Sequence, residues 1–258
     1  MKLYSVFQKK RVVYREEIIN YYKGNRQLAD LNIHRLLKSG NALRIKSGVY
    51  YFKEPNELYN EHLTIDPLLI AGKVHPKGVL AFNTALRVTG DAYSSSHEYQ
   101  IGLPDSEITI PKKFKLLNVT YLFTKMDLSF GLDGCIYKEV NIRYFSKERI
   151  LLEGLMRQEK FFGITEFLNS VDGFSHINPE NLLIMLLKYP VKTASMRLGW
   201  LLERNQNKWY VPEVILQKLE RYRGISRLFL VPGQRNGNIL VSRWNLMVPR
   251  ALLHLEEY

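Results

Sequence analysis

The feature that most restricts the fold is a change of hydrophobic period between Asn25 and Phe52. Apolar side chains first recur at the spacing of one buried helix face, at Ala29, Ile33, Leu36 and Leu37. The glycine at position 40 then predicts the helix end. Two short runs, "ALRI" and "VYYF", follow on either side of a "KSG" turn and predict a hairpin. A helix followed at once by a hairpin points to the α+β fold class.

Residues 1–55 extend this pattern towards the N-terminus. "REEIINYYKG" (Arg15–Gly24) carries Ile18, Ile19 and Tyr22 at helical spacing and ends on glycine. With a first helix before it, the region predicts three helices and then two strands, the order of a winged helix-turn-helix. "KEPNE" (Lys53–Glu57) predicts a short linker. We therefore predict a winged helix-turn-helix over residues 1–55 and a larger mixed α/β domain over residues 56–258.

The larger domain shows both helix and strand signals. Two helical pieces within Leu68–Gly90 are separated by "HPKG", and strands are predicted at "HEYQIGLP", "EITIP", "LLNVTYLF" and "EVNIRYF". Helices follow from an N-cap at Ser146, and the apolar run "LLIMLLK" (Leu182–Lys188) predicts a buried helix. Near the C-terminal end, a hairpin is predicted around a turn at Arg235–Asn238.

The net charge of +12 is concentrated at one end of the chain. Residues 1–55 carry +8, residues 56–145 carry −1 and residues 146–258 carry +5. A localised basic surface suits a polyanionic partner, because each neutralised phosphate releases condensed counterions. The charge distribution therefore favours a nucleic-acid partner, double-stranded DNA for a winged helix-turn-helix.

Several other classes of protein lack support in the sequence. The only cysteine, Cys135, permits no intramolecular disulfide and no CxxC zinc site, which fits a cytoplasmic location. There is no apolar run of membrane-spanning length, no signal-peptide pattern, no paired-histidine metal motif and no glycine-rich phosphate loop. The acidic "PDSE" at Pro104–Glu107 lacks the D/E-x-K triplet that usually accompanies it in nucleases. We expect no catalytic site, no cofactor, no metal and no membrane contact.

The candidate DNA contacts lie in three parts of residues 1–55. The outward face of the helix before the hairpin presents side chains that suit base edges and phosphates, namely Gln27, His34, Arg35 and Lys38. The hairpin would form the wing, with its polar residues at or near the tip, namely Arg44, Lys46 and Ser47. Further phosphate contacts are predicted at the end of the first helix, from Lys9, Lys10 and Arg11.

Two other functions stay open at this point. In the first, the second domain is a nuclease or restriction-associated enzyme that cuts the DNA found by the winged helix, with Asp105 as a candidate metal ligand. In the second, the chain is a protein-interaction module whose basic N-terminal region binds an acidic partner.

The order of motifs along the chain resembles that of the AbiEi-family antitoxins. "IHRLLKSGNALRIKSGVYYF" resembles the start of their winged helix-turn-helix, and "KGVLAFNTALRVTG" their helix of small residues. "VNIRYFSKERILLEGLMR" is similar to their strand and following helix, and "TASMRLGWLLE" to a helix of the antitoxin domain. The closing "WNLMVPRALL" is also similar, except that Pro249 stands where asparagine is expected.

The resemblance implies a type IV toxin–antitoxin system that acts in phage defence. The antitoxin would bind inverted repeats in its own promoter and repress transcription. It would also oppose a cognate nucleotidyltransferase toxin, without requiring a stable complex. By the same resemblance, Arg26 joins the predicted DNA contacts. Arg149, Glu153, Arg197, Trp200 and Glu203 also match family positions, and we expect them to be structural, with Arg149 and Arg197 paired to carboxylates inside the fold.

Overall fold

The computed structural model describes residues 2–58, 65–107, 112–116 and 118–253. It has the predicted α+β class, with helices and several sheets. The chain divides into two compact units. The first contains the residues up to Leu80, His97–Met126 and Gly134–Arg143, and the second contains Ala81–Ser96, Asp127–Asp133 and the residues from Tyr144 onward. The boundary predicted after residue 55 falls inside the first unit and stays a prediction.

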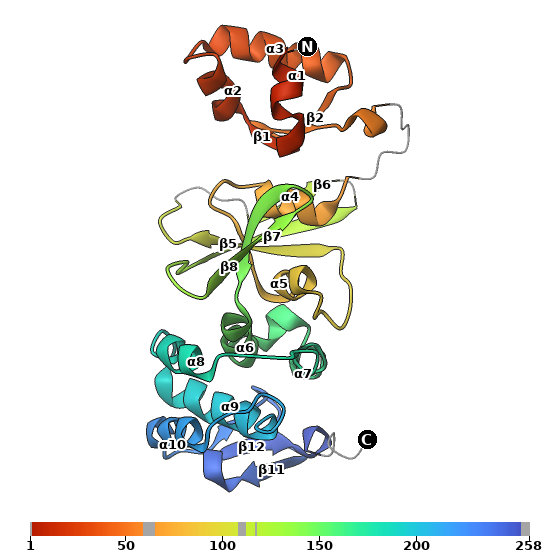
Figure 1. Ribbon diagram of the computed structural model, residues 1–258. Coiled ribbons are helices and arrows are strands. Elements are labelled where there is room, and N and C mark those ends of the chain that lie inside the picture. The colour runs from red at the N-terminus through yellow and green to blue at the C-terminus, as the bar shows by residue number, and fades with distance from the viewer. Residues whose placement is uncertain (1, 59–64, 108–111, 117, 254–258) are drawn as a thin grey trace. The chain divides into compact units, whose positions relative to one another are not determined.

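The N-terminal part of the first unit contains the predicted helices and hairpin (Figure 1). Its elements are α1 (Lys2–Phe7), β1 (Val12–Tyr14), α2 (Arg15–Tyr21), α3 (Arg26–Lys38), β2 (Ala42–Lys46) and β3 (Val49–Phe52). The strand β1 was not predicted. It pairs antiparallel with β3, so the hairpin becomes a three-stranded sheet in the order β1-β3-β2.

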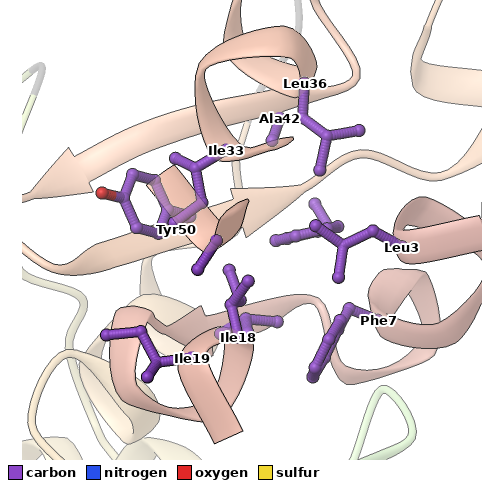
Figure 2. Close-up of a cluster of buried hydrophobic side chains, with 11 residues drawn as sticks. Leu3, Phe7, Ile18, Ile19, Ile33, Leu36, Ala42 and Tyr50 are labelled. Atoms are coloured by element: carbon purple, nitrogen blue, oxygen red, sulfur yellow. The ribbon is translucent and has the colours of Figure 1, made fainter. Parts of the chain in front are cut away.

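This N-terminal part has a hydrophobic core of its own (Figure 2). Ile33 and Leu36 of α3 lie with Ala42 of β2 and Tyr50 of β3, and helices α1 and α2 contribute Leu3, Phe7, Ile18 and Ile19. Three of the four positions that the helical period of α3 selects, Ala29, Ile33 and Leu36, are buried, and the fourth, Leu37, is partly buried against the same core. Since the core uses one face of α3, the opposite face is left on the surface.

The rest of the first unit is built on a mixed sheet in the order β6-β7-β5-β4-β9-β8. Its elements are α4 (Pro67–Lys73), β4 (Val79–Leu80), β5 (Glu98–Pro104), β6 (Lys113–Leu116), β7 (Val119–Met126), and most of β8 (Leu132–Tyr137) and β9 (Val140–Phe145). The β5 strand runs parallel to β7 and antiparallel to β4. Strands are thus confirmed in three of the four predicted runs, and most of the fourth, "EITIP", lies outside the described residues.

The second unit is mainly helical. Its elements are α5 (Phe82–Thr89), α6 (Lys147–Met156), α7 (Ile164–Val171), α8 (Pro179–Leu186), α9 (Val191–Arg204), α10 (Glu213–Tyr222), β10 (Leu228–Phe229), β11 (Asn238–Val241) and β12 (Leu246–Pro249). The predicted N-cap of α6 is confirmed, because the Ser146 hydroxyl accepts a hydrogen bond from the Arg149 amide at 3.3 Å.

Two predictions for this unit were wrong. The strands on either side of the Arg235–Asn238 turn do not pair with each other: β11 pairs antiparallel with β12 across a tight turn at Asn245, while β10 runs parallel to β12. The α8 helix is also only half-buried. Leu182 and Leu186 face the core, but Ile184 is 69% exposed, because a short helix packed on one side must turn its other side outward.

Among the described residues, none of the helices combines the length and the apolar character needed to cross a membrane.

Candidate nucleic-acid interface

The α3 helix is the centre of the candidate interface, and its ends are set by local sequence. The Asn25 side chain accepts a hydrogen bond from the Leu28 amide at 3.0 Å and so caps the N-terminus. At the other end, Gly40 has a φ of +73°, a value that glycine adopts without strain. The predicted helix end at Gly40 is confirmed, and the two ends fix which residues belong to α3.

The polar residues predicted on the outward face of α3 are all exposed. They are Gln27, His34, Arg35 and Lys38, and the resemblance-derived Arg26 is exposed as well. Gln27, His34 and Lys38 lie on one stripe, because they are spaced seven and four residues apart along the helix, and Arg35 lies next to it. The structure therefore brings Gln27, His34, Arg35 and Lys38 to one continuous surface, which we call the α3 surface. Arg26 precedes Arg35 by nine residues, so it lies on the other side of the helix, near its N-terminus.

An ion pair holds α3 against α2. The Arg15 guanidinium donates from Nε and Nη2 to the two carboxylate oxygens of Asp30, at 2.8 and 2.7 Å. This hydrogen bonding keeps the pKa of Asp30 below its ordinary value. The only acidic residue of α3 is therefore neutralised by a neighbouring helix, and it does not oppose an anion at the α3 surface.

The basic residues of α3 have no such partners. Among the residues that the structure describes, no carboxylate lies within ion-pair distance of Arg26, Arg35 or Lys38. Lys23 lies just before α3, in the turn after α2, and it too is exposed and without an ion pair in this part of the chain. Sequence reasoning missed Lys23, although its place in the turn between the two helices was a usable signal.

The residues predicted for the wing separate into two groups. Arg44 is exposed and lies two residues after Ala42 on β2, so its side chain shares the face of the strand that packs against α3. Ser47 is exposed at the turn. Lys46 is half-buried, with its ammonium 5.9 Å from the centre of the Phe123 ring, and burial lowers its pKa. A bulge between Arg44 and Lys46 accounts for their different surroundings. Lys46 therefore does not lie on the α3 surface.

The three basic residues after α1 also lie elsewhere. Lys10 forms an ion pair with Glu17 at 2.7 Å, and both Lys9 and Lys10 line a cavity that Tyr14 and Lys73 also line. That cavity faces α4 and is separate from the residues of α3.

Arg11 is buried rather than exposed. Its guanidinium pairs with Glu57 at 2.7 Å and also with Glu54 and the Tyr51 hydroxyl. Burial, together with a hydrogen bond to Glu57, raises the pKa of Tyr51 to about 12. A buried guanidinium that is paired with two carboxylates is not available to a phosphate, so the candidate interface does not include Arg11.

Two leucines complete the α3 surface and were not predicted. Leu28 is 40% exposed and Leu31 is 46% exposed. Leu31 follows Gln27 by four residues and precedes Arg35 by four, which places it at the centre of the surface. The signal was present in the sequence, because both leucines fall outside the apolar stripe that forms the core.

The other residues singled out by the resemblance are structural. Arg149 is buried and pairs with Glu153 at 3.5 Å, as predicted. The prediction for Arg197 was wrong, because its guanidinium donates to the carbonyls of Leu155 and Phe229 at 2.7 and 3.1 Å rather than to a carboxylate.

Two of the motif residues of α9, Gly199 and Glu203, contact the side chain of Trp244. Trp244 donates from Nε1 to Glu203 at 2.6 Å, and its ring lies against Gly199, where a Cβ would come within 2.1 Å of it. Trp200 is buried in the same helix. The "RLGWLLE" pattern is therefore explained by packing.

The acidic loop has a structural explanation as well. Asp105 and Glu107 lie in a turn after β5, and Glu107 forms an ion pair with Lys77 at 2.6 Å. Within the described part of the chain, no three His, Cys, Asp or Glu residues are grouped as metal ligands would be. Cys135 is half-buried, and burial raises the pKa of its thiol, which disfavours the reactive thiolate.

Comparisons with known proteins show the fold but no family. No family model matches the sequence, and no curated protein matches it. The crystal structure of the Rv2827c protein from Mycobacterium tuberculosis is similar, with a TM-score of 0.62 and 16% sequence identity. The alignment covers 95% of this chain and 89% of that chain. A likeness at this level of identity shows that the two chains share an overall fold.

Proposed function

We propose that residues 1–55 form a winged helix-turn-helix that binds double-stranded DNA, with α3 as the helix that enters the major groove. The observation that carries this proposal is the α3 surface, where two cations without ion-pair partners, Arg35 and Lys38, lie beside Gln27 and His34. A helix fits the width of the major groove, where arginine pairs with guanine, glutamine pairs with adenine, and lysine can also contact phosphates. Arg44 and Ser47 of the wing would contact the adjacent backbone.

We further propose that the protein is an antitoxin and transcriptional autorepressor of the AbiEi type. The order of motifs along the chain supports this part of the proposal. In such a system the protein would bind inverted repeats upstream of its own gene, in the cytoplasm, and oppose a nucleotidyltransferase toxin. A nucleotidyltransferase reading frame beside its gene is therefore expected, and co-expression should relieve the toxicity of that enzyme.

The DNA-binding part is tested with the variant Arg35→Ala/Lys38→Ala. A gel shift with DNA from upstream of the gene should show at least a tenfold loss of affinity, while circular dichroism stays unchanged because both side chains are exposed. Lys218→Ala/Arg221→Ala is the matched control, since it removes one lysine and one arginine at the same spacing from the exposed side of α10. Equal affinities for the wild type and the α3 variant would refute the proposal.

A further inference from the structure

An apolar patch lies in the middle of the basic α3 surface. It consists of Leu28 and Leu31, which are 40% and 46% exposed and lie three residues apart on the same side of the helix. The core beneath α3 is built from Ala29, Ile33 and Leu36 on the opposite side. Single exposed leucines are common on protein surfaces and require no explanation. Two adjacent ones at the centre of a charged surface suggest a partner that is both anionic and locally apolar.

Double-stranded DNA is such a partner. Its major groove lies between two rows of phosphates, and each thymine projects its C5 methyl group into that groove. RNA differs on both counts, because uracil lacks the methyl group and the A-form major groove is too narrow for a helix. Leu31 lies one helical turn from both Gln27 and Arg35, so a helix that brings these two to base edges would also bring Leu31 to base edges.

We infer that Leu31, with Leu28 beside it, contacts thymine methyl groups and so helps to determine which DNA sequence the protein prefers. This inference rests on the proposed function and specifies part of its readout. The polar side chains of α3 would distinguish base pairs by hydrogen bonding. The two leucines would favour A·T pairs at the positions that they cover, because a buried methyl contact is lost with every other base.

The test replaces every thymine of a bound fragment with deoxyuridine, which removes only the C5 methyl groups. Withdrawing one buried methyl group should weaken binding about three- to fivefold. We expect the wild-type protein to bind the uracil-containing DNA at least threefold more weakly. Leu31→Ala should bind the thymine-containing DNA with a similar loss, and its response to uracil should be smaller than that of the wild type.

Two controls separate this effect from other causes. Leu31→Ala is expected to stay folded, because the side chain is exposed and alanine favours helix, and thermal unfolding checks this. Val6→Ala also truncates an exposed apolar residue, but in α1, and it should keep the full response to uracil.

Equal binding of the wild type to both DNAs would overturn the inference. An undiminished uracil effect in Leu31→Ala would overturn it too, because Leu31 would then not be the side chain that contacts the thymine methyl groups. Absence of binding to either DNA is a different result, which would overturn the proposed function and this inference with it.

Discussion

From the number of cations around α3, the proposed function predicts how the affinity for DNA depends on salt concentration. Five exposed cations near this helix have no ion pair among the described residues: Lys23, Arg26, Arg35, Lys38 and Arg44. If each neutralises one phosphate, the logarithm of affinity should fall with the logarithm of salt with a slope of about −4.5 per protomer. Affinity should then drop about 500-fold between 50 and 200 mM salt.

Removal of two of these charges gives a quantitative test. In Arg35→Ala/Lys38→Ala the slope should move to about −2.7, and the drop over the same salt range should shrink to about 40-fold. Fluorescence anisotropy with a labelled duplex at four salt concentrations measures both slopes. Lys46→Ala is the internal control, because Lys46 is half-buried over Phe123 and its loss should leave the slope near the wild-type value.

Two results would contradict a role of the α3 cations in DNA binding. The first is a wild-type slope near zero, since no phosphates would then be neutralised. The second is an equal change of slope in Lys46→Ala and in the double variant, since that would mean that the α3 surface has no special part in binding.

Three further predictions concern the stability of the fold, and urea denaturation measures each. Arg11→Met should lower the free energy of unfolding by about 2 kcal/mol, because the mostly buried carboxylate of Glu57 loses its guanidinium partner. The loss is limited because the other carboxylate, that of Glu54, is half-exposed to water. An unchanged urea midpoint would show that these ion pairs contribute nothing to stability. Gly199→Ala should cost about 2 kcal/mol, because the added Cβ meets the Trp244 ring, and full stability would contradict that packing. Asp30→Asn should be less stable than the wild type at pH 6, and the difference should shrink as the pH falls below about 4. The ion pair with Arg15 lowers the pKa of Asp30, so its stabilisation is complete above about pH 4 and is lost as the pH falls through the lowered value; a difference independent of pH would rule this out.

Local sequence patterns predicted the parts of the fold that are stabilised locally. The α3 helix follows from its apolar period, its asparagine cap and its glycine end, all of which lie within sixteen residues. The β1 strand is only three residues long and depends on pairing with β3, about forty residues away. The final hairpin was misplaced for a related reason, because the position of Asn245, rather than that of Gly237, determines which strands pair.

Some site residues were predicted wrongly because their partners also lie far away in the sequence. A basic residue can be recognised in a sequence, but its partners cannot. Arg11 forms ion pairs with Glu54 and Glu57, which lie more than forty residues away. The Lys46 ammonium lies over the ring of Phe123. Leu31 was overlooked because apolar residues in helices are usually assigned to the core.

In the proposed function, the outward face of α3 occupies the major groove of DNA. Methylation interference tests it most directly, because dimethyl sulfate modifies guanine at N7 in the major groove and adenine at N3 in the minor groove. With a fragment bound by the wild-type protein, guanine methylation should block binding at discrete positions, and Arg35→Ala should lose sensitivity at one or more of them. Interference confined to adenine N3, or a guanine pattern unchanged in Arg35→Ala, would contradict the claim.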